Sequence, residues 1–423
     1  MIPQERLAET VRVEGAWVVA TLARTLGSLD LAEDAVQEAA VAALRAWPRT
    51  GVPDNPRAWL AVTARRKAYD VLRREAARPG KESAASRELL AVTADPVEEA
   101  TRAPEPGSVV RDDMLRLVFT CCHPALSLEA RVALALRTLA RLEVASIARA
   151  FLVPEATMAK RLVRARQKIA AARIPYRVPF DSELPERLPA VLAVVHLIAT
   201  EAHAPTGGED VARVDLEAEA VRLARLLAEL MPGEPEVLSL LSLLLFTAAR
   251  RPARTGADGE PVLLAGQDRS RWDRGQVREA SALLGVAVRR SGGKAGPYQL
   301  QAHLSACHST APSWADTDWD RIIGLYDLLL SRSANPAVAL NRAVAVGERD
   351  GPAAMLAAVD ALPPQPRSHL WHAARADALQ RLGRVEEAGH ELLTAIDLAP
   401  TGPERRLLAR RLSGSLPPPG HGH

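Results

Sequence analysis

The sequence predicts an all-α protein, and three observations lead to this prediction. Aromatic residues make up only 4% of the 423 residues, while Ala, Leu, Arg and Glu, which favour helices, are abundant. Runs of β-branched and aromatic residues, which would indicate strands, are scarce. Apolar residues recur instead every three or four positions over long stretches. We expect two small helical domains followed by a helical solenoid.

The chain divides into five parts along its length. Two helical segments, 8–78 and 108–176, are separated by residues 79–107, where Pro, Gly and charged residues predict a flexible linker. A long helical extension is expected over residues 178–413. Residues 414–423 are rich in Pro and Gly, and we expect them to form a disordered tail.

The N-terminal and C-terminal parts of the chain carry opposite net charges. Residues 1–177 hold 28 Lys and Arg against 21 Asp and Glu, whereas the remainder holds 26 against 30. The net positive charge of the N-terminal part favours a nucleic-acid partner. Three cysteines are too few for a disulfide framework, and no signal peptide or membrane-spanning stretch of about 20 apolar residues is recognisable. We therefore expect a cytoplasmic protein that does not contact a membrane.

Residues 30–48 predict a long helix with an acidic first half, which suits the positive end of the helix dipole. Its outer face carries Asp34, Gln37 and Glu38, a polar patch suited to a basic protein partner. The expected inner face consists of Leu31, Ala35, Glu38 or Ala39, Ala42 and Trp47.

A second helix is expected over residues 55–74, after a loop at 49–54. Asn55 is a favourable cap residue, and Pro56 is a favourable first helical residue. The helix interleaves arginines and a lysine with Trp59 and Tyr69, a mixture typical of proteins that hold single-stranded nucleic acid. For either aromatic ring taken alone, packing in the core is the favoured alternative.

Residues 142–151 and 156–169 predict two helices separated by a turn at Pro154. The second helix would bury Met158, Leu162, Ala165 and Ile169 and present a cationic outer face. A short helix, a tight turn and a longer basic helix fit the helix-turn-helix that reads DNA in the major groove. A solvated amphipathic helix is the less favoured alternative.

Together, these three motifs resemble the extracytoplasmic-function sigma factors, a group of the sigma-70 family of RNA polymerase subunits. Residues 30–48 are similar to the region two helix that grips the clamp coiled coil of the polymerase core, and residues 55–74 to the part that opens the minus-ten element. Residues 156–169 resemble the region four helix that reads the minus-thirty-five element, and the flap of the polymerase would be a further partner. The resemblance implies core-polymerase contacts for Asp30, Glu33, Asp34, Gln37 and Glu38. It implies promoter DNA contacts for Asn55, Arg57, Trp59, Arg65, Arg66, Lys67, Arg73, Arg74, Thr157, Lys160, Arg161, Arg164, Arg166 and Lys168.

The extension resembles a subgroup of these sigma factors that carries a C-terminal domain related to tetratricopeptide repeats. Residues 119–124 and 267–273 are similar to recurring motifs of that subgroup. Small and apolar residues between Ala376 and Pro400 keep the spacing of a 34-residue helical repeat, and a degenerate unit is expected at 336–363. Two roles are equally favoured for residues 267–273. The segment either docks on the other domains as a regulatory loop, or its side chains form a local network that holds the loop in place. It consists of Gln267, Asp268, Arg269, Ser270, Arg271, Trp272 and Asp273.

The sequence therefore predicts a non-enzymatic transcription initiation factor without a cofactor, whose extension regulates it in cis and has a protein or small-molecule partner. His196 and His203 lack the spacing of a strong metal motif, and adjacent Cys121 and Cys122 are expected in the core, so we expect no metal site. The alternatives are a stand-alone helix-turn-helix regulator with a repeat-type sensor domain and an enzyme housed in the extension.

Overall fold

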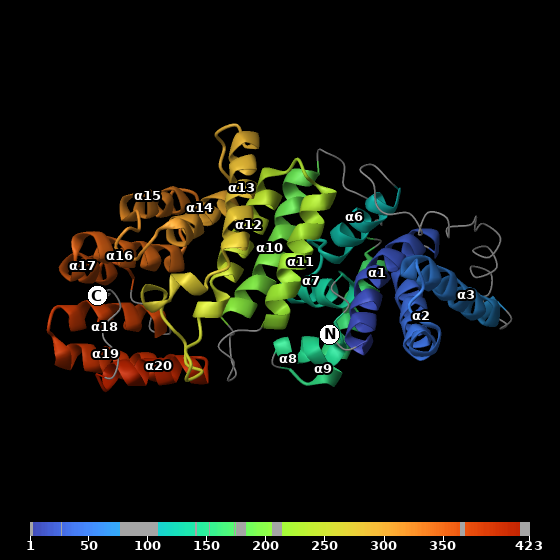
Figure 1. The fold of residues 1–423 in the computed structure, drawn as a ribbon, viewed down its shortest axis with the longest axis horizontal. Helices are drawn as coiled ribbons and strands as arrows, with labels where there is room; N and C mark the ends of the chain where they lie inside the picture. Colours follow the sequence, from blue (N-terminus) through green and yellow to red (C-terminus); the bar gives the residue numbers. More distant parts are fainter. Residues whose placement is uncertain are drawn as a thin grey trace. The chain divides into compact units, whose positions relative to one another are not determined.

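The computed structural model describes residues 3–26, 28–76, 109–139, 142–151, 153–172, 174, 183–204, 214–363 and 369–414. Within these ranges the chain is almost entirely helical, and the extended pairing consists of one isolated bridge between Thr255 and Pro261 (Figure 1). The predicted all-α fold is confirmed. The expected linker at 79–107 lies outside the described residues, as do residues 415–423 of the expected tail.

The chain forms two compact units, residues 1–197 and residues 198–423, which we call the N-terminal and C-terminal units. Helix α10 (Leu184–His203) contains the boundary between them. Among the described residues, no helix is both long and apolar enough to cross a membrane.

Three helices that pack on one another begin the N-terminal unit: α1 (Pro3–Leu26), α2 (Leu29–Thr50) and α3 (Pro56–Ala76). The Ser28 hydroxyl accepts a hydrogen bond from the Leu31 amide at the start of α2, as an N-cap does. Asn55 caps α3 as predicted, because its Oδ1 accepts from the Ala58 amide at 3.0 Å. Helix α2 continues to Thr50 and ends at Gly51, which has a φ of 81°, so the expected loop at 49–54 begins two residues later.

The second half of this unit contains α6 (Val109–Cys121), α7 (Leu128–Leu134), the π-helical turn η1 (Ala135–Leu139), α8 (Val144–Ala150) and α9 (Glu155–Ala171). Helices α7 and α8 pack on α9, while α6 and η1 pack on α1. Cys121 and Cys122 are buried free thiols, and burial raises the pKa of Cys122 to about 12. The thiols therefore stay protonated in the core.

The C-terminal unit begins with helices arranged around α12 (Pro235–Ala249), which is buried along most of its length. Its neighbours are α11 (Val214–Leu230), α13 (Arg274–Arg290) and α14 (Pro297–Thr310). A helix that is apolar on every side requires neighbours on every side, and these three helices provide them. Helix α15 (Trp319–Leu330) packs on α14 and leads into the last part of the unit.

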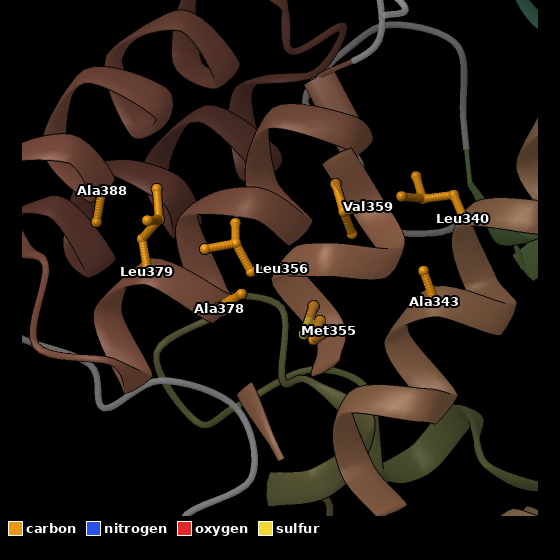
Figure 2. Packing of buried hydrophobic residues seen from close by; sticks show 8 residues of the cluster. All are labelled: Leu340, Ala343, Met355, Leu356, Val359, Ala378, Leu379 and Ala388. Atoms are coloured by element: carbon orange, nitrogen blue, oxygen red, sulfur yellow. The ribbon is translucent and has the colours of Figure 1, made fainter. Parts of the chain in front are cut away.

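Five helices complete the chain: α16 (Pro336–Asp350), α17 (Pro352–Asp360), α18 (His369–Arg381), α19 (Val385–Leu398) and α20 (Gly402–Leu412). Each packs on the next along the chain. Figure 2 shows one cluster shared by α16, α17, α18 and α19, in which Leu356 and Val359 of α17 lie between α16 and α18. The small residues Ala376, Ala388 and Ala395, which the sequence places at helix contacts, are all buried.

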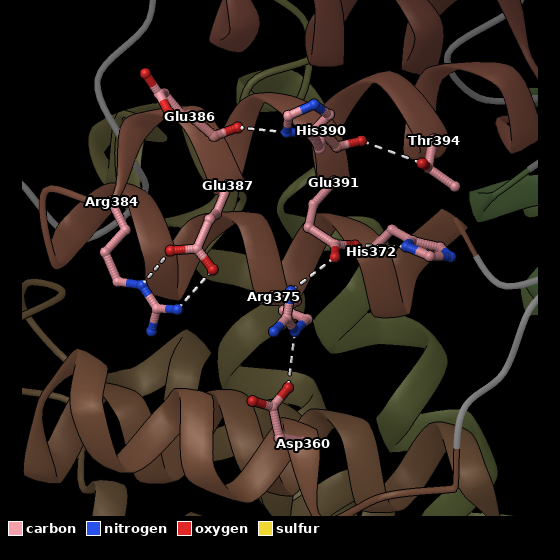
Figure 3. Close-up of polar contacts among 9 residues, drawn as sticks. All are labelled: Asp360, His372, Arg375, Arg384, Glu386, Glu387, His390, Glu391 and Thr394. Atoms are coloured by element: carbon pink, nitrogen blue, oxygen red, sulfur yellow. Dashed lines mark hydrogen bonds and ion pairs between the residues drawn. The ribbon is translucent and has the colours of Figure 1, made fainter.

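Polar side chains connect α17, α18 and α19 outside this core (Figure 3). The Arg375 guanidinium donates to Asp360 on α17 and to Glu391 on α19, at 2.7 Å in each case. His372 contacts the other oxygen of Glu391 at 2.6 Å. One arginine thus connects three consecutive helices, which fixes their relative rotation.

Helices α16 and α17 approach each other closely at Gly347. A Cβ atom at this position would lie 2.5 Å from the Met355 Cβ, and real structures essentially never show such a contact. Gly347 lies within a helix, so its role is to provide space rather than an unusual backbone angle.

We expect Gly347→Ala to lower the free energy of unfolding of the C-terminal unit by about 1–3 kcal/mol, because the two helices must separate. The matched control is Gly324→Ala in α15, where a Cβ would have no neighbour within 4 Å. It should leave stability unchanged or raise it by up to about 1 kcal/mol through helix propensity. Urea denaturation followed by circular dichroism measures both, and equal midpoints would contradict the packing argument.

Candidate functional site

A surface groove of about 540 Å³ lies between α2 and α3 in the N-terminal unit. Three of the predicted polymerase-contact residues, Asp34, Gln37 and Glu38, line it. The Lys67 ammonium of α3 lies 3.2 Å from the Glu38 carboxylate across the groove. Leu31 and Ala42 were expected in the core, but they line this groove because the buried stripe of α2 is rotated slightly. Acidic and apolar side chains therefore line the groove together with two cations, Arg45 and Lys67.

Exposed apolar side chains continue the groove surface along α2. Val41 and Leu44 are 46% and 47% exposed, although both are large and aliphatic. Partial burial raises the pKa of Asp34, and the nearby Glu33 and Glu38 carboxylates add to this, while Arg166 opposes it. Acids next to exposed aliphatic residues are typical of a surface that docks a basic, amphipathic helix.

Glu33 differs from its neighbours because its side chain is fully buried. The Thr138 hydroxyl of η1 donates to one carboxylate oxygen, and the Arg166 guanidinium of α9 donates to the other. Arg166 also lies 3.3 Å from Asp30. A residue predicted to bind polymerase and a residue predicted to bind DNA are therefore paired with each other in this conformation, although 133 positions separate them.

On α3, some of the predicted DNA-contact residues contact other parts of the unit, and others face solvent. Arg57 forms an ion pair with Glu14 of α1 and lies over the Trp17 ring, 5.3 Å from its centroid. Trp59 makes an edge contact with Trp47 at 5.3 Å between ring centroids. Trp59 and Tyr69 are both only partly buried, and the Arg65 guanidinium lies over the Tyr69 ring, 5.3 Å from its centroid. The exposed predicted positions are Asn55, Arg66, Arg73 and Arg74.

The predicted two helices are present as α8 and α9, and Phe151, Val153 and Pro154 lie between them. Met158, Leu162 and Ala165 are buried as expected, and Ile169 is half-buried. Arg161 pairs with Glu129 of α7 at 3.2 Å. The predicted base- and phosphate-contact residues that face solvent are Thr157, Lys160, Arg164 and Lys168.

The predicted regulatory motif at 267–273 is held in place by local contacts. Arg269 donates to the carbonyl oxygens of His308 and Ala311 at 2.7 Å each and lies 4.6 Å from the centroid of the Trp272 ring. Trp272 is 2% exposed. Asp268 and Asp273 act as caps of the turn η4 (Arg269–Arg271) and of α13. Asp268, Ser270, Arg271 and Asp273 remain exposed, and a docking role for them stays a prediction.

Sequence reasoning missed several residues that organise the N-terminal unit. Asp113 of α6 is fully buried and pairs with Arg24 of α1 at 2.9 Å. Thr138 and Glu14 have comparable roles as partners of Glu33 and Arg57. Each pair joins distant parts of the chain, so no local spacing in the sequence indicates it.

The structure groups no three His, Cys, Asp or Glu side chains as a metal site within the part of the chain that it describes. His203 instead contacts Arg254, with 2.8 Å between Nδ1 and the guanidinium. Burial, together with Arg254 and Arg250, lowers the pKa of His203 to about 3. The histidine is therefore neutral at physiological pH.

Arg166→Met should lower the free energy of unfolding of the N-terminal unit by about 3 kcal/mol, because it leaves the buried Glu33 carboxylate without its cation. The double variant Glu33→Gln/Arg166→Met should recover at least half of that loss. Lys168→Met is the matched control: it removes an exposed cation of the same helix and should change stability by less than about 0.5 kcal/mol. The protection of the α2 and α9 amides against hydrogen exchange measures stability in all three variants. Equal protection in the Arg166→Met and Lys168→Met variants would show that the Glu33–Arg166 pair does not stabilise the unit.

Comparisons with known proteins match two separate parts of the chain. Residues 10–78 match the family described as Sigma-70 region 2, and residues 187–288 match one described as Family of unknown function (DUF6596). The chain is 41% identical over 392 residues to "Uncharacterized protein R00370" of Rhizobium meliloti (strain 1021), an alignment that covers 92% of this chain and 91% of that protein. No solved structure matches it. The chain thus belongs to the same family as the Rhizobium protein and carries a sigma-70 region 2 domain at its N-terminal end.

Proposed function

We propose that this protein is an RNA polymerase sigma factor of the extracytoplasmic-function group, which binds core polymerase and directs promoter recognition, DNA melting and transcription initiation. The observation that carries the proposal is the groove between α2 and α3, which combines acids with exposed aliphatic residues inside the segment that matches sigma-70 region 2. The protein would act in the cytoplasm and would itself make or break no bond.

The groove is proposed to receive the clamp coiled coil of the polymerase core. Asp34 and Glu38 would face cations of that partner, and Val41 would contact its apolar side. Lys67 already pairs with Glu38 at 3.2 Å with both side chains about half exposed, so little free energy is needed to exchange this contact for an intermolecular one.

Helices α3 and α9 are proposed to contact promoter DNA. The exposed cations of α9 suit phosphate and guanine contacts in the major groove of the minus-thirty-five element. Arg66, Arg73 and Arg74 on α3 suit the backbone of the melted minus-ten element. Contacts at two separated promoter elements require α2 and α9 to move apart, so we propose that the Glu33–Arg166 pair breaks when the promoter is bound.

The extension is proposed to regulate these contacts in cis as a domain related to tetratricopeptide repeats. Support comes from the consecutive helix pairs α16–α17 and α18–α19, with buried small residues at their contacts. Stacked helix pairs of this kind present extended surfaces to a protein or small-molecule partner. The exposed residues of 267–273 are a proposed part of this regulatory surface.

Reversing two charges tests the polymerase contact. Asp34→Lys/Glu38→Lys should weaken binding to bacterial core polymerase by about tenfold or more, because cations of the partner would then meet cations. Glu186→Lys, at an exposed acid that does not line the groove, is the control and should bind as the parent does. Affinity is measured by surface plasmon resonance at fixed salt. Promoter binding that needs no polymerase would favour the stand-alone regulator.

Removal of the extension tests regulation in cis. A chain that ends after residue 178 should change promoter-specific transcript yield with core polymerase by about fivefold or more, the size of an ordinary allosteric coupling. Circular dichroism confirms that the truncated protein is helical. Equal transcript yields from both proteins would exclude regulation of initiation by the extension.

A further inference from the structure

The C-terminal unit contains a cavity of about 310 Å³ that the proposed function does not use. Its walls come from the end of α10, from Arg250 and Arg254 on either side of the turn η2 (Arg251–Ala253), from residues before and after η3 (Leu264–Gly266), and from the start of α20. This volume is within the range of small-molecule sites.

Arg250 is the unusual residue of this cavity. Its Nε atom is buried without a hydrogen-bond partner, and its guanidinium has no ion pair within the described residues. Burial lowers the pKa of Arg250 to about 10, and the neighbouring Arg254 and Arg269 contribute to this shift. The guanidinium nevertheless stays charged at physiological pH. A largely buried cation without a counter-charge is costly, so it favours a site for an anion.

His203 adds a second donor to the same wall. Arg254 donates to His203 Nδ1 at 2.8 Å and to its carbonyl oxygen at 2.9 Å. Because arginine can only donate, His203 Nδ1 must accept, and the ring proton is therefore at Nε2. His203 and Arg250 both line the cavity, so a ligand meets an N–H donor beside a cation.

The acids nearby are engaged elsewhere. Glu404 is the one acid among the described lining residues, and the Thr401 hydroxyl donates to its carboxylate at 3.0 Å. His369 lies 3.8 Å from its other oxygen, and these two contacts hold the pKa of Glu404 below its ordinary value. Glu217 pairs with Arg251 at 3.2 Å. Neither carboxylate forms an ion pair with Arg250, so the positive charge there is not neutralised by them.

The remaining wall is apolar, formed by the residues between Pro261 and Leu264 and by Leu407 of α20. Gln267, the first residue of the 267–273 motif, also lines the cavity, and its buried Oε1 has no partner among the described residues.

We propose that this cavity binds a small organic anion, whose carboxylate or phosphate pairs with Arg250 and His203 and whose apolar part rests on the 261–264 wall. Gln267 Oε1 accepts from a hydroxyl or amine of the ligand.

Anion-dependent thermal stability of the full chain tests the site, with inorganic phosphate and hexanoate as the two probes and chloride at equal ionic strength as the reference. At least one probe should raise the Tm of the unsubstituted protein, and the rise should level off as the probe concentration increases. Arg250→Met should weaken that response at least about tenfold, the loss expected for one charge-assisted contact. Without any probe, the same variant should melt no lower than the parent, because an uncompensated buried charge is gone.

Arg289→Met is the matched control, since Arg289 is an exposed arginine of α13 that does not line the cavity, and it should respond to anions as the parent does. A response to phosphate alone identifies a phosphorylated ligand, and a response to hexanoate alone identifies a carboxylate. The proposal fails if neither probe exceeds chloride, or if Arg250→Met responds as the parent does.

Discussion

Close approach of helices at small residues is the constraint on which both units depend. In α2 the buried stripe contains Ala32, Ala35, Ala39 and Ala43, and α3 buries Ala61, Ala64 and Ala68. In the C-terminal unit Ala376, Ala388 and Ala395 have the same role, and Gly347 leaves space for Met355 where a Cβ would collide with it. At these positions no large side chain separates the helices. The helices therefore lie close together, which makes their relative positions sensitive to single methyl groups.

Buried charges select which helices become neighbours in this closely packed arrangement. Glu33 accepts from η1 and from α9, so α2 is attached to the helix-turn-helix segment. Asp113 connects α6 to α1, and Asp377 connects α18 to α20 through Arg411 at 3.1 Å. Such pairs add little net stability, but a misplaced helix would leave a charge unpaired in the core, which is costly. Arg250 is the contrasting case, because no described acid neutralises it.

The N-terminal unit combines two surfaces whose roles differ. The groove between α2 and α3 carries acids and aliphatic residues, and the outer face of α9 carries cations. The Glu33–Arg166 pair lies between these two surfaces and connects their helices. If α9 moves when DNA binds, as proposed, Glu33 would lose its cation, which would couple the proposed contacts with polymerase and with DNA.

The sequence by itself determined the helices and many of their faces. The cap at Asn55, Pro154 in the turn and the apolar spacing of α9 are local signals, and local backbone physics acts on them directly. The polar patch on α2 was predictable for the same reason, as was the exposed cationic face of α9. The spacing of small residues also indicated the helix contacts around Ala388.

Only the tertiary structure decided which polar residues of those helices remain accessible. Glu33 and Asp34 are adjacent acids, yet one is buried against Arg166 and the other lines a groove. The partners of Glu33 and of Arg57 lie far away in the sequence, and the cavity at Arg250 is formed by four separate segments. A pattern of neighbouring residues defines the face of one helix, whereas pairing and cavities depend on how several helices meet, and that geometry results from the packing of the whole unit.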